Sequence, residues 1–417
     1  MRLVWRRSDR RRKMKAFWKT VVSTMVTTTV FLVLCSSVLC SGQPTALTRI
    51  EVRKTKQLTT DSISYDAFWI NDTTIAFIRA VASPDTPRIY RPGIYVRTGS
   101  WTNFAENQKI YLSNTNTLNT LDFWYLGWET LFSSFIPTAD RSGTRVFVFL
   151  RTADTFADDK VLFVDVQKRI RAEYRLSWER GTFGRFSPYL GTVSPDGKKL
   201  AMDLGWYGLG RGLGVHTGST GEFQRMLLRS DRTGAGAIAW SVDSKKLAFV
   251  SCTDTSSCDS IQKSGRPEYI VIADLETDEL VELPYPCDTY SSISWSPWGD
   301  EIVAHGAEYQ IVGDPRSVDY GIRYTGEQLW KISVDTHKRT PLIDWGGTEC
   351  TWSPDGEMIA FRGKDAVWVM DENGGNQVKI ADNAFLPRWS PDSRRLVFTR
   401  VDDDDWSYIW LATLELR

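Results

Sequence analysis

Two short apolar runs separated by a polar turn recur along this chain. In the clearest copies the first run ends in Trp-Ser, a turn of Pro, Asp and Gly follows, and the second run is rich in β-branched and aromatic residues. Pro presets the turn, Asp bonds back to the backbone and Gly accepts positive φ, so each copy predicts a tight β-hairpin. The clear copies span 192–204, 237–250, 292–305, 350–362 and 386–400, and two degenerate copies span 66–79 and 133–151.

Most hairpins are followed by two more runs with strand character, such as those in Tyr269 to Pro284 and Leu329 to Ile343. Four antiparallel strands per repeat predict an all-β fold, a β-propeller of seven four-stranded blades. Six blades remain the alternative, because Asn114 to Leu131 fits the repeat poorly. The third strand of the first blade is either 93–96 or 109–112.

The last repeat has only three strands, since Tyr408 to Leu416 is followed by no further run. A strand within 43–60, ahead of the first hairpin, resembles the fourth strand of a repeat. We therefore expect this N-terminal strand to pair with the last blade and close the ring, which would remove a free sheet edge.

The W-S-P-D-G-x-x-[LI]-A-F pattern, followed by an I-x-V-x-D strand, resembles the TolB-like, or PD40, propeller repeats, which are related to the WD40 class. The resemblance covers about residues 57–417. It implies the fold and not the function, because these repeats occur in scaffolds, in regulatory domains of enzymes and in lyases. The chain departs from TolB, since the short stretch 43–60 leaves no room for the α/β domain that TolB carries before its propeller.

The N-terminus has the pattern of a membrane signal. Residues 1–19 hold nine basic residues and one acid, and Thr20 to Leu39 carries no charge. This pattern predicts a signal peptide or signal anchor over 1–42, followed by the propeller domain over 43–417. Met1 and Met14 are alternative starts. The mature chain is therefore expected outside the cytoplasm: periplasmic, secreted or held to the membrane by its N-terminal segment.

Charge and cysteine content narrow the function further. Without residues 1–42 the chain keeps 42 basic and 50 acidic side chains, a net charge of −8. This acidic balance argues against nucleic acid as a partner.

Cys252 and Cys258 bracket one loop and are a candidate disulfide. Cys350, in an inner strand, is expected to be a buried free thiol, and Cys287 is left unassigned.

The predicted hairpin turns are tight, whereas the connections between second and third strands are long in several repeats. In a propeller these connections share one face, and loops on a rigid scaffold commonly carry binding residues. Blade-end packing is the competing interpretation for the aromatic members. The candidate binding residues on this looped face are Trp206, Tyr207, Arg211, His305, Tyr309, Tyr320, Arg323, Tyr324 and Trp406.

Four consecutive aspartates, Asp402, Asp403, Asp404 and Asp405, are a candidate calcium site because Ca²⁺ prefers oxygen ligands. A solvated acidic loop is the competing interpretation, and no other cofactor is expected. The tryptophans before the turns, Trp69, Trp240, Trp295, Trp352 and Trp389, are expected to pack the core.

No catalytic set is recognisable: of the three histidines, His216, His305 and His337, none is placed like a general base in a shared pocket, and no G-x-S-x-G elbow is present. We therefore expect a monomeric, non-enzymatic binding module for an envelope or extracellular protein or a glycan. Two alternatives remain. One is a lyase-like enzyme acting on polysaccharides, although lyases with this type of repeat use His-rich metal sites. The other is a TolB-like transport component.

Overall fold

The computed structural model describes residues 49–61, 63–80, 108–118, 120–125, 138–139, 145–150, 160–165, 170–175, 186–206, 210–217, 223–226, 233–252, 268–285, 289–312 and 321–417. The predicted signal segment, 1–42, lies outside these ranges. All regular structure within them is β, and no helix there is long and apolar enough to cross a membrane. The all-β prediction is confirmed.

The described strands form seven four-stranded sheets, which we call blades 1 to 7. Blade 1 contains β2 (Ser64–Asn71), β3 (Thr74–Ala80), β4 (Gln108–Asn114) and β5 (Thr120–Tyr125). Blade 2 contains β6 (Thr138–Ala139), β7 (Arg145–Leu150), β8 (Lys160–Asp165) and β9 (Ile170–Arg175). Blade 3 contains β10 (Phe186–Val193), β11 (Lys199–Trp206), β12 (Gly210–Thr217) and β13 (Phe223–Met226).

Blade 4 contains β14 (Thr233–Trp240), β15 (Lys246–Cys252), β16 (Glu268–Asp274) and β17 (Leu280–Glu282). Blade 5 contains β18 (Thr289–Trp295), β19 (Glu301–Val312), β20 (Gly321–Ser333) and β21 (Arg339–Ile343). Blade 6 contains β22 (Thr348–Trp352), β23 (Met358–Gly363), β24 (Ala366–Asp371) and β25 (Val378–Asp382). Blade 7 contains β26 (Ala384–Trp389), β27 (Arg395–Val401), β28 (Ser407–Leu416) and β1 (Ile50–Gln57).

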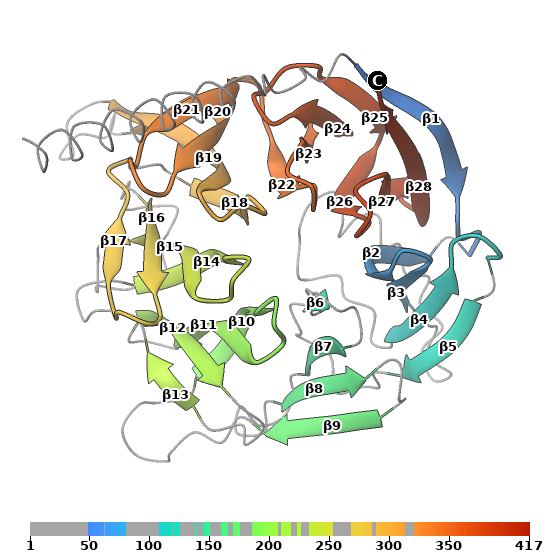
Figure 1. Ribbon diagram of the computed structural model, residues 1–417, viewed down its shortest axis with the longest axis horizontal. Coiled ribbons are helices and arrows are strands. Elements are labelled where there is room, and N and C mark those ends of the chain that lie inside the picture. Colours follow the sequence, from blue (N-terminus) through green and yellow to red (C-terminus); the bar gives the residue numbers. More distant parts are fainter. Residues whose placement is uncertain are drawn as a thin grey trace, which may run out of the picture. The chain divides into compact units, whose positions relative to one another are not determined.

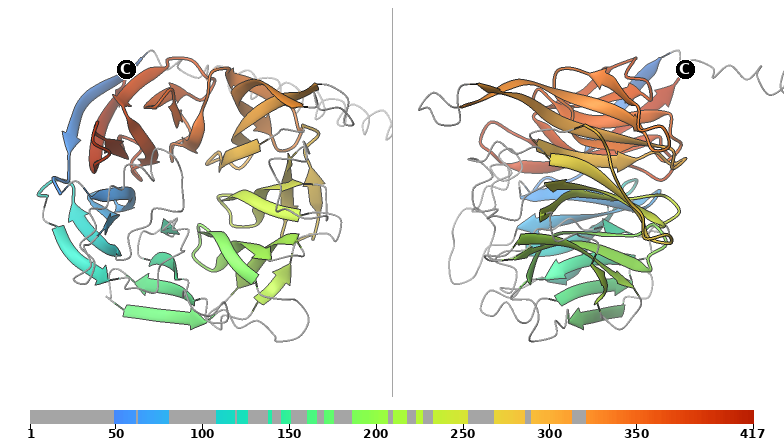
Figure 2. Two further views of the ribbon diagram at one scale, coloured as in Figure 1. Left: turned by 180° about the vertical axis from the view of Figure 1, so that it is seen from behind. Right: turned by 90° about the vertical axis from the view of Figure 1, so that its left-hand side faces the viewer.

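The blades are arranged around a common centre, with the first strand of each repeat innermost (Figure 1). Consecutive blades contact each other through these inner strands, and blade 7 contacts β2 of blade 1. Views from behind and from the side show the same propeller arrangement (Figure 2). The third strand of blade 1 is β4, so residues 109–112 supply it, and β5 provides the fourth strand that the sequence left unexplained.

Blade 7 combines the two ends of the propeller. β1 pairs antiparallel with β28 from Ile50 opposite Leu416 to Gln57 opposite Trp410. A second link joins blades 7 and 1, because the Trp69 Nε1–H donates to the carbonyl oxygen of Arg388 at 3.1 Å. Strands at opposite ends of the sequence thus share one sheet.

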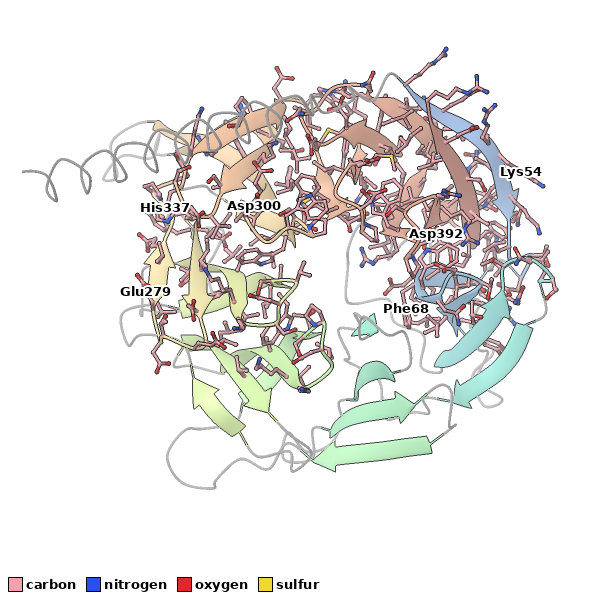
Figure 3. The ribbon with its side chains drawn as sticks, viewed as in Figure 1. Lys54, Phe68, Glu279, Asp300, His337 and Asp392 are labelled. Carbon is pink, nitrogen blue, oxygen red and sulfur yellow. The ribbon has the colours of Figure 1, made fainter. Side chains whose placement is uncertain are left out.

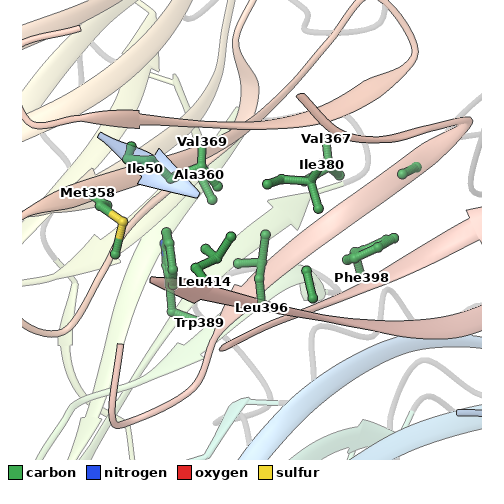
Figure 4. Packing of buried hydrophobic residues seen from close by; sticks show 12 residues of the cluster. Ile50, Met358, Ala360, Val367, Val369, Ile380, Trp389, Leu396, Phe398 and Leu414 are labelled. Atoms are coloured by element: carbon green, nitrogen blue, oxygen red, sulfur yellow. The ribbon is translucent and has the colours of Figure 1, made fainter. Parts of the chain in front are cut away.

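Apolar side chains fill the interfaces between neighbouring blades. The cluster between blades 6 and 7 unites Val367 and Ile380 with Leu396 and Leu414, and it includes Ile50 from β1 (Figure 4). Because each sheet buries apolar side chains against its neighbours, no blade can keep its core without the next one.

The tryptophans before the turns lie in these interfaces, with 6–7% of their surface exposed, so their predicted packing role is confirmed. Most also bond to the preceding blade. The indole N–H of Trp295 donates to the Ala239 carbonyl at 3.0 Å, and that of Trp389 donates to the Thr351 carbonyl at 3.2 Å. Trp352 is the exception, because its Nε1 is buried and has no hydrogen-bond partner within the described ranges.

A serine follows every one of these tryptophans except Trp69, and it organises the hairpin turn. In blade 4 the Ser241 hydroxyl donates to Asp243 at 2.6 Å and accepts the Lys246 N–H at 2.8 Å. Burial raises the pKa of the Asp243 carboxyl, but the bonds from Ser241 and the Lys245 N–H outweigh burial and lower it. In blade 7 the Ser390 hydroxyl donates to the equivalent aspartate, Asp392, whereas in blade 5 the Ser296 hydroxyl donates to Asp300, two positions later in the turn (Figure 3).

Blade 5 differs from the sequence prediction. Residues 306–327 were expected to form a long loop, but β19 and β20 continue through most of this range as a paired hairpin. Tyr309 lies opposite Tyr324, and Gln310 lies opposite Arg323. The alternating aromatic and β-branched residues of this segment have high strand propensity, which explains the extension.

Candidate functional site

A pocket of about 540 Å³ opens in blade 7 beside the loop between β27 and β28. The connection from β25 to β26 and the end of β1 complete its wall, so the pocket lies on the face that carries the connections between second and third strands. Its volume falls in the range of small-molecule sites. It is lined by Gln57, Thr60, Asn383, Arg400, Val401, Asp402, Asp403, Tyr408 and Trp410.

Sheet register places the main side chains of the pocket. Tyr408 and Trp410 are two residues apart in β28, so they point to the same face of the sheet. Arg400 lies opposite Tyr408 in β27, and Gln57 of β1 lies opposite Trp410. The Arg400 guanidinium carbon is 5.0 Å from the centroid of the Trp410 ring, a cation–π distance.

Trp410 contributes the aromatic part of this wall. Its Nε1 is buried inside the blade and has no hydrogen-bond partner among the described residues, so this N–H is not itself part of the pocket surface. The ring offers an apolar face beside the Arg400 guanidinium, which can donate hydrogen bonds.

Asp402 shapes the loop of the pocket. Its Oδ1 accepts the N–H groups of Asp404 at 3.1 Å and Trp406 at 2.8 Å, and its Oδ2 accepts the Tyr408 hydroxyl at 3.2 Å. Asp402 therefore holds the turn and positions Tyr408. Asp403 is exposed and lines the pocket.

The acidic run does not form a metal cage in this structure. Among the ranges described above, no three or more His, Cys, Asp or Glu side chains are grouped so that they could hold a metal ion. The oxygens of Asp402 are already hydrogen-bonded within the loop. Calcium binding at Asp402 to Asp405 stays a prediction from sequence.

The other candidate residues do not gather in this pocket. Trp406 lies in the same loop but does not line it. Strands contain the backbone of Trp206 (β11), Arg211 (β12), Tyr309 (β19), and Arg323 and Tyr324 (β20), where loops were predicted. Tyr207, Tyr320, Cys258 and Cys287 lie outside the described residues, so the disulfide between Cys252 and Cys258 stays a prediction.

His305 is buried instead of being presented at a loop. Its side chain is 4% exposed, and Nε2 lies 3.9 Å from the Glu327 carboxylate in the neighbouring strand. Burial lowers its pKa to about 4, so the imidazole is neutral at physiological pH. The expectation that it ends a strand at the looped face is wrong, because β19 continues past it to Val312.

Cys350 is a buried free thiol, as predicted. Its Sγ lies 3.2 Å from the Ser292 hydroxyl of blade 5. Burial raises the pKa of the thiol to about 12, which keeps it protonated and unreactive. Cys350 therefore contributes to packing between blades 5 and 6.

A second charged cluster, which the sequence analysis missed, lies on the inner strands. In four repeats, the residue three positions before the repeat tryptophan lies in a β-bulge and has a positive φ. These residues are Asp66 at 50°, Ala237 at 46°, Glu349 at 54° and Leu386 at 54°. Register shifts in β2, β14, β22 and β26 mark these bulges. Bulges redirect side chains and are frequent beside functional sites.

Two of these bulge residues carry carboxylates. Alignment of the repeats could have revealed them, since the equivalent positions in other copies hold Ala237, Ser292 and Leu386. Glu349 accepts the Leu386 N–H at 2.5 Å and lies 3.6 Å from the Arg362 guanidinium. Burial raises its pKa, although Arg362 and the Leu386 N–H act in the opposite direction.

The fold defines the chain as a β-propeller protein. No family model and no curated protein matches the sequence. Among solved structures, hydrazine synthase of Kuenenia stuttgartiensis is similar with 13% identity and a TM-score of 0.52, over 84% of this chain and 96% of that one.

A putative TolB of Agrobacterium tumefaciens shows 16% identity and a TM-score of 0.43, over 72% of this chain and 94% of that one. An oligogalacturonate lyase of Vibrio parahaemolyticus shows 13% identity and a TM-score of 0.37, over 66% and 88%. At such low identity, likeness bears on the fold alone.

Proposed function

We propose that this propeller is a non-enzymatic binding module that takes a saccharide unit of a glycan in the blade 7 pocket. The pocket combines an aromatic face, a guanidinium, carboxylates and amide groups in one wall. Polyhydroxylated ligands need both apolar contact and several hydrogen-bond partners. The observation that carries the proposal is the Arg400 guanidinium beside the Trp410 ring in this wall, 5.0 Å from the ring centroid, which places a hydrogen-bond donor next to an apolar face.

The setting of the pocket supports a binding role over a catalytic one. It is built on strands β1, β27 and β28 of one sheet, and rigid strands hold a binding site in a fixed geometry. Of the described histidines, His305 is buried in blade 5, and His337 lies in the turn between β20 and β21. A location outside the cytoplasm, expected from the N-terminal segment, fits a glycan of the envelope or matrix as partner.

The test is binding of the full chain to an immobilised panel of neutral and acidic oligosaccharides, followed by titration calorimetry on any ligand retained. Trp410→Ala and Arg400→Gln should each weaken binding at least about tenfold, the effect of losing one or two good contacts. Trp298→Ala is the matched control, because Trp298 is 72% exposed in the hairpin turn of blade 5.

Retention of a glycan with equal affinity by the wild type and Trp410→Ala would refute this pocket as the site. If no oligosaccharide binds, the saccharide proposal is wrong. In that case, a protein captured by the wild type and lost with Trp410→Ala would assign the same surface to a protein partner.

A further inference from the structure

The inner wall of the propeller holds a buried acid that the pocket in blade 7 does not use. Asp66 lies in β2 and is 8% exposed. Its backbone N–H donates to the Thr399 hydroxyl of blade 7 at 3.1 Å, which fixes the bulge. No hydrogen bond or ion pair to its carboxylate is present among the described residues.

Arg388 of blade 7 carries the positive charge that acts on the Asp66 carboxylate. It lies in β26, and its carbonyl accepts the indole N–H of Trp69, which is three residues after Asp66. Its guanidinium makes one bond in the described part of the chain, at 3.3 Å to the carbonyl of Pro387. The Arg388 charge lowers the pKa of Asp66, yet the two groups form no ion pair.

The other carboxylate of the cluster differs from Asp66. Glu349 has both a backbone N–H donor and the Arg362 guanidinium as partners. Arg362 is further held by Asp365 at 3.1 Å and lies over the Phe385 ring at 4.2 Å. The cluster therefore contains one hydrogen-bonded acid, Glu349, and a second pair, Asp66 and Arg388, that forms no ion pair among the described residues, although the Arg388 charge also lowers the pKa of Glu349. We call Asp66 and Arg388 the open pair.

An open buried pair is costly. Removing a carboxylate from water without a partner costs several kcal/mol, and the left-handed backbone at a non-Gly residue adds about 1–2 kcal/mol. Such positions are uncommon in folded proteins and concentrate where a ligand or a reaction uses them. β2, β22 and β26 are the inner strands of their blades and lie at the centre of the ring (Figure 1).

The two open groups require opposite charges on the ligand. Asp66 offers acceptor oxygens that suit an ammonium group, and Arg388 offers a planar set of donors that suits a carboxylate. We propose that Asp66 and Arg388 form a site at the centre of the propeller for a small zwitterion of the α-amino-acid type. The site lies apart from the blade 7 pocket and does not depend on its function.

The test uses the full chain and L-alanine as probe, titrated at pH 7.5 and followed by ligand-observed NMR. L-alanine should saturate the protein with a dissociation constant no weaker than about 10 mM. L-alaninamide, which lacks the carboxylate, and L-lactate, which lacks the ammonium, should each bind at least about tenfold more weakly.

Variants assign the site. Asp66→Asn and Arg388→Gln should each weaken L-alanine binding at least about tenfold. Asp365→Asn is the matched control for charge, since Asp365 is an exposed acid of blade 6 with 71% of its side chain accessible. Trp410→Ala is the control for the blade 7 pocket, and both controls should bind L-alanine as the wild type does.

Three results would overturn the proposal. One is the absence of saturable L-alanine binding, and another is unchanged binding by Asp66→Asn. Equal binding of L-alaninamide would show a site for cations alone. If Arg388→Gln failed to fold, Asp66→Asn would decide, because removing the buried charge is expected to stabilise the fold.

Discussion

At the scale of single residues, the inner strands concentrate unfavourable features. Asp66 is a buried acid and Glu349 a partly buried one, and both lie in the left-handed region at positions where other repeats hold apolar or small residues. Their side chains support little of the hairpin itself, because the Ser and Asp of each turn do that. Ala or Leu would pack better at these two positions. A functional role therefore explains the two carboxylates more simply than packing does.

A pH profile can test the cost of burying Asp66. Burial raises its pKa to about 6, with Arg388 opposing and Glu349 adding to the rise. The unfolded-state pKa is about 3.9, so the folded state binds the proton more tightly. The contribution of Asp66 to stability is therefore most favourable below about pH 4 and is lost as pH rises through about 6.

Asp66→Asn should accordingly raise the free energy of unfolding by about 1–3 kcal/mol at pH 7.5. The gain should shrink through pH 6 and be small near pH 4, where wild-type Asp66 is protonated in the folded state and about half protonated in the unfolded state. Urea unfolding of both proteins from pH 4 to 8 measures this. A gain that stays constant across that range would contradict burial of the ionised form.

At the scale of elements, the hairpin is the unit that the sequence specifies best. Trp295-Ser296 and the equivalent pairs mark the end of each inner strand, and the turn chemistry after them is local. The indole bonds between blades add a regular link from one hairpin to the next. Trp352 breaks this regularity because its N–H has no acceptor.

This difference predicts unequal costs for the same substitution. Trp295→Phe loses the indole bond to the Ala239 carbonyl, whereas Trp352→Phe removes a donor that has no partner among the described residues. Trp295→Phe should therefore destabilise the protein by about 1–2 kcal/mol more than Trp352→Phe. Urea midpoints of the two variants test this, and equal losses would show that indole packing alone matters.

Longer elements and the pocket were harder to predict. Tyr309 to Val312 have strand character, but they follow a position where a strand was expected to end, so a loop was predicted.

Of the residues that line the pocket, the sequence analysis identified only Asp402 and Asp403, because the run of aspartates is visible in the sequence. Trp410, Arg400 and Gln57 occupy ordinary strand positions, and Gln57 reaches the pocket only through pairing of β1 with β28.

At the scale of the whole molecule, stability depends on contacts between units that are distant in sequence. β1 supplies Ile50 to the core between blades 6 and 7, and its backbone covers the edge of β28. Loss of β1 would expose a long sheet edge, which favours association with other chains.

Ile50→Ala should therefore loosen blade 7 selectively. The side chain is 2% exposed, and its truncation should cost about 2–4 kcal/mol. Hydrogen exchange should quicken in β28 and little in blade 4. Val271→Ala, a truncation in the core of blade 4, is the control and should leave β28 protected. Equal acceleration in both blades for Ile50→Ala would contradict local loosening.

Blade 7 contains strands from both ends of the propeller sequence, so it cannot be completed until the last strand has been synthesised. The ribosome makes β1 before every other strand of the propeller, yet its partner β28 emerges only after six further sheets have been made. Throughout that interval β1 is an unpaired strand on a growing chain, and loop closure over this separation is slow. Completion of the seventh sheet should be the last step of folding, and the interval before it is when the chain is most exposed to strand exchange with its neighbours.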